Sequence, residues 1–209
     1  LDNDAIHLYL RHAYIPTPYS IYKNIFKLEP GSFVVFDIKN KTCSKPKSYW
    51  NLIEVISNST QNRITMSDSD LVEELDTKLK RSVQMRMLSD VPIGAFLSGG
   101  IDSSLVVSFM KESAKKPFDT YTIGFEEKDF SEHLKAKELT NYLGIKNNQL
   151  FLKGKDMLEV IEKIPNIYDE PFADSSQIPT FLLSQFASKS VKVVLSGDGG
   201  DEMFGGYNR

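Results

Sequence analysis

Two glycine-rich strings combine residue types that bind phosphate groups and metal ions. The first is Ser98-Gly99-Gly100-Ile101-Asp102-Ser103-Ser104, which follows the apolar residues 95–97. Paired glycines allow a tight turn that brings several backbone N–H groups towards one point, and a helix starting there adds the positive end of its dipole. Serine hydroxyls also donate to phosphate oxygens. The first string therefore predicts a loop that binds an anionic phosphate group.

Asp102 is the residue of this string that does not suit a phosphate by itself, because a carboxylate repels phosphate unless a cation lies between them. We therefore predict that Asp102 is a ligand for Mg²⁺. The string lacks the lysine of a Walker A loop and the glycine spacing of a dinucleotide-binding loop. The alternative is an ordinary helix start preceded by glycine. The full run of suitable residues after an apolar strand favours the anion site.

The second string, Ser196-Gly197-Asp198-Gly199-Gly200-Asp201-Glu202, places three carboxylates within five residues and follows the apolar run 191–195. Carboxylates held this close repel one another, so a cation or a cationic ligand group is expected there. A solvent-exposed acidic turn is the alternative. Together the two strings predict Mg²⁺ held by Asp102 and Asp201 across a polyphosphate.

The segments around both strings alternate between strand and helix patterns. Behind Ser67, a candidate N-cap, apolar residues recur at four-residue spacing from Leu71 to Val83, which is typical of an amphipathic helix. Strands are predicted at residues 93–97, 120–125, 149–152 and 191–195, and further helices at 103–113, 132–143, 156–164 and 180–187. This alternation predicts an α/β fold, an open parallel sheet with flanking helices. Such sheets bind ligands beyond the carboxyl ends of their strands, where both strings lie.

The first fifty residues instead predict a small antiparallel β segment. Residues 1–14 and 21–28 contain short apolar runs, and residues 33–38 and 42–50 have strand-forming patterns. Glu29-Pro30-Gly31-Ser32 has the residues of a type II turn. The polar stretch 51–66 predicts a linker and a domain boundary.

Composition excludes several classes of protein. With 25 Lys and Arg against 28 Asp and Glu, the 209-residue chain lacks the basic excess of a nucleic-acid binder. No apolar run is long enough to span a membrane, and no signal peptide is visible. The one cysteine, Cys43, cannot form an intramolecular disulfide, so we expect a cytoplasmic protein. Because the chain starts at Leu1 and its second string runs on towards Arg209, we expect a piece of a longer protein.

The strings together resemble a known family. Residues 98–103 match the SGGxDS signature of the ATP-pyrophosphatase superfamily, and residues 196–207 resemble the synthetase domain of glutamine-hydrolysing asparagine synthetases. Residues 169–174 resemble the bacterial branch of that family, and residues 14–18 resemble the end of its glutaminase domain. The resemblance implies an adenine nucleotide α-hydrolase-like sheet over residues 67–209. It also implies the C-terminal part of an Ntn-type, class II amidotransferase domain over residues 1–60.

The implied reaction is an ATP-dependent amide synthesis. An aspartate carboxylate would attack the α-phosphorus of ATP and expel pyrophosphate, and ammonia from glutamine would convert the β-aspartyl-AMP into asparagine and AMP. The implied cofactors are ATP and Mg²⁺, and the partners are small molecules. The oligomeric state stays open, with a homodimer of the full-length protein as one arrangement.

The resemblance also assigns roles to individual residues. The implied nucleotide-binding residues are Leu97, Ser98, Gly99, Gly100, Asp102, Ser103, Ser104, Ile123, Ser196 and Gly197. The implied metal ligands are Asp102 and Asp201, and the implied catalytic residues are Asp198 and Asp201. Asp198 stands where many members have Glu, a residue proposed to bind the substrate amino group or to take a proton from ammonia. Leu97 and Ile123 would contact adenine.

Two departures and two alternatives remain. The family's glutaminase uses an N-terminal cysteine as its nucleophile, whereas Cys43 lies inside a predicted hairpin and cannot serve. Where relatives often carry His-His-Glu, this chain has Asn147-Asn148-Gln149, so no catalytic role transfers there. Related enzymes adenylate a sugar acid or a β-lactam precursor with similar loops. A nucleotide-binding module without chemistry of its own is the other alternative.

Overall fold

The computed structural model describes residues 1–125 and 132–207, which form two compact units. Unit 1 comprises Leu1–Met66 and Glu162–Ser175, and unit 2 comprises Ser67–Ile161 and Ser176–Arg209. Within the described ranges, no helix combines the length and the apolar character that crossing a membrane requires.

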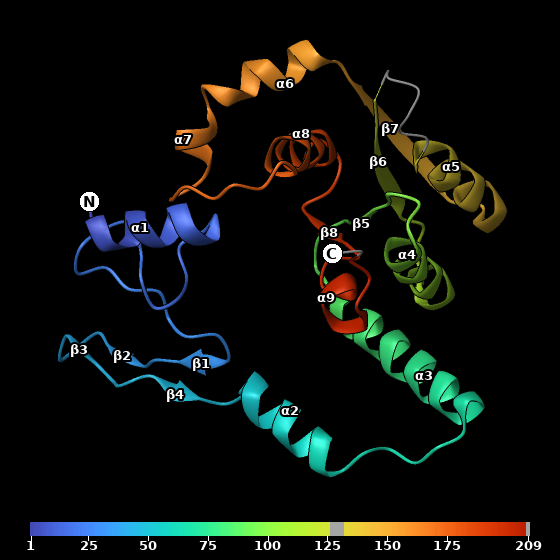
Figure 1. The fold of residues 1–209 in the computed structure, drawn as a ribbon. Coiled ribbons are helices and arrows are strands. Elements are labelled where there is room, and N and C mark those ends of the chain that lie inside the picture. The colour runs from blue at the N-terminus through green and yellow to red at the C-terminus, as the bar shows by residue number, and fades with distance from the viewer. Residues whose placement is uncertain (126–131, 208–209) are drawn as a thin grey trace. The chain divides into compact units, whose positions relative to one another are not determined.

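Unit 2 is built on a parallel sheet of four strands, which are labelled in Figure 1. The strands are β5 (Ile93–Phe96), β6 (Asp119–Phe125), β7 (Lys146–Leu152) and β8 (Val193–Leu195), in the order β7-β6-β5-β8. Because β8 pairs with β5 rather than with β7, the last strand crosses over to the other side of the first one. The predicted open parallel α/β sheet is confirmed, although β7 begins earlier than the predicted residue 149 and β8 begins later than the predicted residue 191.

Helices pack on both faces of this sheet. The unit contains α3 (Asp68–Arg86), α4 (Ile101–Ser113), α5 (Glu132–Leu143), α6 (Gly154–Ile161), α8 (Gln177–Ala187) and α9 (Gly200–Phe204). In one core Leu97, which directly follows β5, packs with Val107 and Met110 of α4. In the other core Tyr121 of β6 packs with Ala187 of α8. The two cores lie on opposite faces of the sheet, because Ala95 and Leu97 belong to the first core whereas Phe96 between them packs with the second.

The predicted start of α3 is also confirmed. Ser67 is the N-cap, and its hydroxyl accepts a hydrogen bond from the N–H of Asp70 at 3.3 Å. Val83 is buried in the core against α4, whereas Leu71 and Leu75 at the other end of the same stripe are exposed. The described residues therefore bury only the C-terminal part of this apolar stripe.

Unit 1 corrects two predictions made from sequence. The stretch 1–14 contains a helix, α1 (Asn3–His12), and not a strand. The side chain of Asp2 caps its first turn, and Ala5, Ile6 and Tyr9 pack on Ile15 and Ile21, a spacing that suits one helix face. Ile6, Leu8 and Leu10 alternate as in a strand, and this pattern caused the wrong prediction. In the helix Leu10 is exposed.

The expected linker is the second correction, because residues 52–61 form α2 (Leu52–Gln61). The side chain of Asn51 accepts hydrogen bonds from the N–H groups of Ile53 and Glu54, at 2.9 and 3.2 Å. Asn51 is thus an N-cap, a signal that the polar composition of the stretch concealed.

Between these helices lie short antiparallel pairs. β1 (Ser32–Phe33) pairs with β4 (Lys47–Ser48), and β2 (Phe36–Asp37) pairs with β3 (Thr42–Cys43). Gly31 has the positive φ of 67° that the predicted turn requires. The antiparallel segment is confirmed, although its strands are shorter than predicted, and Cys43 is exposed on β3.

Residues 162–175 belong to unit 1, although they come between α6 and α8 in the chain. The segment contains α7 (Ile164–Ile167). Glu170 forms an ion pair with Lys27 and accepts a hydrogen bond from the N–H of Ile21 at 3.3 Å. The N–H of Ala173 donates to the carbonyl of Ala13 at 2.7 Å. Contacts far apart in sequence therefore hold this segment in place.

Candidate functional site

The loop after β5 is a tight turn closed by its own serines. The hydroxyls of Ser98 and Ser103 lie 3.0 Å apart, and the N–H of Ser98 donates to Ser103 Oγ at 3.3 Å. The N–H of Gly100 donates to Ser98 Oγ at 3.2 Å. Gly99 has a φ of 86°, and a Cβ there would lie 2.6 Å from the carbonyl oxygen of Glu132. Glycine is thus required both for the turn and for the close approach of α5.

The first turn of α4 begins directly in this loop. Its N-cap is Gly100, which offers no side chain to the helix N–H groups, and the first helical bond runs from the N–H of Ser104 to the carbonyl of Gly100 at 3.1 Å. The N–H groups of residues 101–103 precede that bond and have no acceptor within the helix. These N–H groups could bind an anion, and the phosphate-binding role of the loop stays a prediction.

The loop after β8 lies directly against the first loop. A Cβ at Gly197 would lie 2.6 Å from the backbone nitrogen of Ser103, and a Cβ at Gly200 would collide with the carboxylate of Asp102. These contacts follow from the pairing of β5 with β8, which brings the carboxyl ends of both strands to the same edge. The two predicted loops therefore form one site.

Asp102 of the first loop and Asp201 of the second, the two predicted metal ligands, lie against different glycines. Asp201 is half-buried, and its carboxylate lies where a Cβ of Gly206 would be, whereas Asp102 lies against Gly200. Within residues 1–125 and 132–207, no group of three His, Cys, Asp or Glu side chains converges as a metal site. A cation here would need oxygens from the substrate as well, which is how Mg²⁺ usually binds beside phosphates. The oxygen chemistry of Asp102 and Asp201 fits such a cation.

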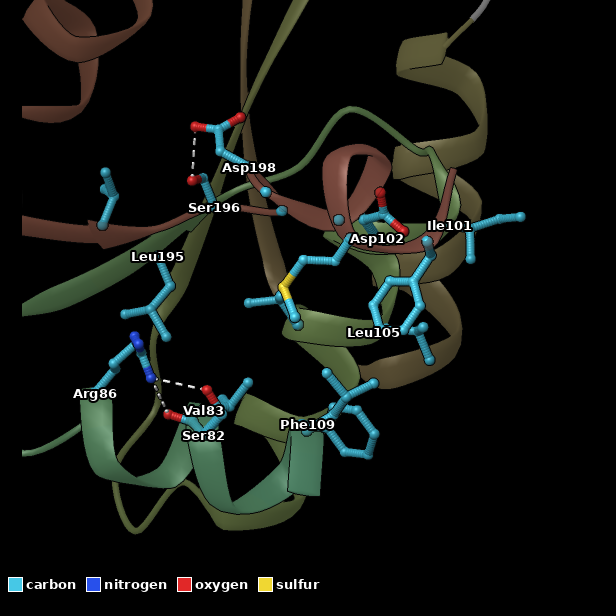
Figure 2. A pocket seen from close by; sticks show the side chains of 18 of the residues that line it. Ser82, Val83, Arg86, Ile101, Asp102, Leu105, Phe109, Leu195, Ser196 and Asp198 are labelled. Carbon is cyan, nitrogen blue, oxygen red and sulfur yellow. Dashed lines mark hydrogen bonds between the residues drawn. The ribbon is translucent and has the colours of Figure 1, made fainter. Parts of the chain in front are cut away.

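Two hydrogen bonds order the other carboxylates of this loop. Ser196 Oγ donates to Asp198 Oδ2 at 2.9 Å, and both side chains appear in Figure 2. The Tyr207 hydroxyl donates to Glu202 Oε1 at 2.6 Å, and this bond lowers the pKa of the Glu202 carboxyl below its usual value. The Glu202 carboxyl is therefore favoured in its charged form, and each of the two carboxylates is held by a hydrogen bond.

A cavity of about 750 Å³ opens beside the contact between the two loops. Figure 2 shows Asp102, Ser196 and Asp198 around it, with Leu105 and Phe109 of α4 and Val83 of α3 forming an apolar wall. Arg86 lies at its rim, where its guanidinium donates to the carbonyl and the hydroxyl of Ser82 at 3.1 and 2.8 Å. Among the residues predicted for the site, Asp102, Ser196, Gly197 and Asp198 line this cavity.

The remaining predicted residues lie outside that cavity. Ser98, Ser103 and Ser104 belong to the turn itself. Leu97 is buried in the core with 1% of its surface exposed, and its N–H donates to the carbonyl of Tyr121 at 3.0 Å. Ile123 is half-buried on β6. The adenine contacts of Leu97 and Ile123 stay predictions.

Sequence reasoning missed the polar residues beneath the first loop. The hydroxyl of Thr122 donates to the carbonyl of Leu97 at 2.8 Å, and Thr122 is also bonded to Asn147. Threonine at alternate positions of a buried strand, Thr120 and Thr122, was the available signal, because buried hydroxyls need partners.

Sequence comparisons relate this chain to known proteins. The asparagine synthase family model matches residues 74–209. A Methanocaldococcus jannaschii protein that bears the asparagine synthetase name is 43% identical over 208 residues, which cover 99% of this chain and 39% of that protein. Glutamine-hydrolysing asparagine synthetase 1 of Bacillus subtilis is 36% identical over 208 residues, covering 100% of this chain and 31% of that protein. The chain thus spans between about a third and two fifths of the length of these relatives.

A solved structure is also similar at low identity. It is the glutamine-dependent NAD+ synthetase of Acinetobacter baumannii in complex with ADP, with a TM-score of 0.47 and 16% identity over 83% of this chain and 31% of that chain. The sequence comparisons are decisive by themselves, because the family model covers more than half of the residues. This chain belongs to the asparagine synthase family.

Proposed function

We propose that the full-length protein is an ATP-dependent ligase that converts aspartate into asparagine with ammonia from glutamine, in the cytoplasm. The observation that supports this most directly is the contact between the two glycine-rich loops, at Gly197 and Ser103 and at Gly200 and Asp102. The serine hydroxyls and helix N–H groups of the first loop thus lie beside the carboxylates of the second, at an edge of the sheet where ligands bind in open α/β folds.

The two parts of the sequence would belong to two different domains of the full-length protein. Residues 67–209 would be the N-terminal part of the synthetase domain, and residues 1–60 the C-terminal part of the glutaminase-type domain. The compact units divide near the same point, between Met66 and Ser67, with residues 162–175 added to unit 1. The glutamine-hydrolysing nucleophile would lie outside this chain, since the exposed Cys43 sits on a hairpin.

In this proposal the first loop binds the β- and γ-phosphates that leave as pyrophosphate. The N–H groups at the start of α4 and the hydroxyls of Ser98, Ser103 and Ser104 supply donors. Because these donors are held by the turn before the substrate arrives, little reorganisation is needed as charge develops on the leaving group.

Asp102 and Asp201 would hold Mg²⁺ together with phosphate oxygens. When bound, Mg²⁺ would neutralise part of the phosphate charge and so favour attack at the α-phosphorus. Without it, the carboxylate of Asp102 would repel the polyphosphate that the neighbouring N–H groups attract. The two carboxylates therefore make nucleotide binding depend on the cation.

The amidation step needs a group that accepts a proton. The aspartate β-carboxylate attacks the α-phosphorus, pyrophosphate leaves, and ammonia then attacks the acyl carbon and expels AMP, releasing one proton. Asp198 is the candidate to take that proton or to bind the substrate amino group, and Ser196 holds its carboxylate. Ser196 and Gly197 would line the acyl-adenylate, and Leu97 and Ile123 would border adenine.

Pyrophosphate release by the full-length protein tests the proposal. With ATP, Mg²⁺, ammonium and aspartate, we expect release of pyrophosphate and AMP and formation of asparagine in equal amounts. Release with a sugar acid or a β-lactam precursor but not with aspartate would replace asparagine synthesis by a related ligase activity. Nucleotide binding without release for any carboxylate would leave only a binding module.

A further inference from the structure

A buried threonine anchors the point where the phosphate loop begins. Leu97 is the residue between β5 and Ser98, and it lies one position beyond the last strand pair, Phe96 with Tyr121. The hydroxyl of Thr122 donates to its carbonyl at 2.8 Å, and Thr122 is only 1% exposed. This side-chain bond takes over where the backbone ladder of the sheet ends.

Thr122 belongs to a polar network in an otherwise apolar core. The oxygens of Thr122 and Thr120 lie 3.0 and 3.1 Å from the side-chain amide of Asn147 on β7, and Thr120 also donates to the carbonyl of Lys146 at 3.4 Å. Asn147 Nδ2 is buried and has no hydrogen-bond partner among the described residues. A buried amide N–H without a partner is costly, so its orientation matters.

The count of hydrogens selects one arrangement. A hydroxyl has one hydrogen, so Thr122 cannot donate to Leu97 and to Asn147 at once. If Thr122 donates to Leu97, Asn147 must donate to Thr122, and turning the amide by a half rotation brings its unpartnered nitrogen against both threonine oxygens. The turned arrangement leaves a carbonyl oxygen unpaired, which proteins tolerate better than an unpaired N–H.

We propose that Thr122 is a positioning residue for the phosphate loop, oriented by the amide of Asn147 and acting through the carbonyl of Leu97. This inference rests on the proposed function, because it assigns the loop's alignment for nucleotide to a residue that touches no substrate. The N–H of Leu97 is held by Tyr121 and its carbonyl by Thr122. With both groups held, Ser98 starts the turn in a fixed direction.

Substitutions on β6 test the inference in the full-length protein. Thr122→Val removes the hydroxyl at nearly constant volume, and Thr122→Ser keeps it. Thr120→Val is the matched control, because Thr120 is equally buried and bonded to Asn147, but its hydroxyl donates to the carbonyl of Lys146 and not to that of Leu97. The readouts are the Kd for α,β-methylene ATP with Mg²⁺, amide hydrogen exchange over residues 98–104, and the melting temperature.

The expected pattern separates positioning from stability. Loss of one hydrogen bond predicts that Thr122→Val raises the Kd by between about twofold and tenfold and speeds exchange over residues 98–104. Thr122→Ser should restore both values, and Thr120→Val should lower the melting temperature while leaving both unchanged. Equal effects of the two valine variants, or an unchanged Kd and exchange in Thr122→Val, would overturn the inference.

The proposed function can fail separately. If the wild-type protein binds the analogue but releases no pyrophosphate with aspartate, the ligase proposal is wrong while binding and exchange still decide the role of Thr122. If the wild-type protein binds no nucleotide, unchanged exchange over residues 98–104 in Thr122→Val refutes the anchor. Faster exchange there would support it as an anchor of the loop alone.

Discussion

The carboxylate of Asp102 lies against Gly200, so the first turn of α4 contacts the first turn of α9. Any side chain at position 200 would occupy the place of that carboxylate. The absence of a side chain at Gly200 is therefore what allows the two loops to meet.

Substitution of Gly200 by alanine tests this relationship. Overpacking should displace Asp102 and lower stability by about 1–3 kcal/mol. Because the displaced carboxylate is the proposed cation ligand, Mg²⁺-dependent pyrophosphate release should fall about tenfold or more. Gly154→Ala is the matched control, since Gly154 has no atom within 4 Å of a built Cβ. Equal activity of both variants would contradict the argument.

Replacing Asp102 by asparagine removes the charge at nearly constant shape. If Asp102 holds Mg²⁺, the substitution removes several kcal/mol of transition-state stabilisation, and the rate of pyrophosphate release should fall about a thousandfold. Higher Mg²⁺ concentration should recover little of the loss. The exposed Asp90 offers the control substitution Asp90→Asn. Unchanged turnover of Asp102→Asn, measured as pyrophosphate release, would reject the assignment of this ligand.

The bond from Tyr207 to Glu202 predicts a pH effect of known sign. The pKa of Glu202 in the folded protein lies below its usual value of about 4.3. The bond therefore stabilises the fold at every pH above that usual value. This contribution to stability is lost as the pH falls through the pKa of the folded state. Tyr207→Phe should raise the pKa of Glu202, as measured by carbon NMR of its carboxyl group. It should also destabilise the protein at neutral pH and match the wild type in acid.

The matched control for this pH effect is Tyr142→Phe, because Tyr142 is 87% exposed on α5. That variant should leave the pKa of Glu202 in place. An unchanged carboxyl titration in Tyr207→Phe would show that the hydroxyl does not set the pKa.

Lys27 and Glu170 predict an energetic coupling within unit 1. Both side chains are largely buried, at 32% and 24% exposure, and Lys27 also donates to the carbonyl of Ile15 at 2.6 Å. A double-mutant cycle with Lys27→Met and Glu170→Gln, followed by urea unfolding, should give an interaction energy of about 0.5–3 kcal/mol. The exposed pair Lys155 and Glu159 should give about 0.3–0.5 kcal/mol by the same cycle. Equal couplings of the two pairs would contradict the stronger interaction predicted for Lys27 and Glu170.

The agreement between sequence and structure is closest where the signal is local. The strand before Ser98 and the helix after it were predictable because apolar residues, glycine and serine follow one another in a short stretch. The capping of α3 by Ser67 was equally local. In contrast, α1 was predicted as a strand because the burial of Ala5 depends on Ile15 and Ile21, which a window of neighbours does not include.

The strand and helix alternation of unit 2 and the positions of both loops could be predicted from residue order, since these features follow from neighbouring residues. The pairing of β8 with β5, the contact of Asp102 with Gly200 and the bond from Thr122 to Leu97 became known from the fold alone. The same holds for the ion pair of Glu170 with Lys27. These contacts join residues that are distant along the chain, and they depend on the register and packing of whole elements, which local residue patterns do not encode.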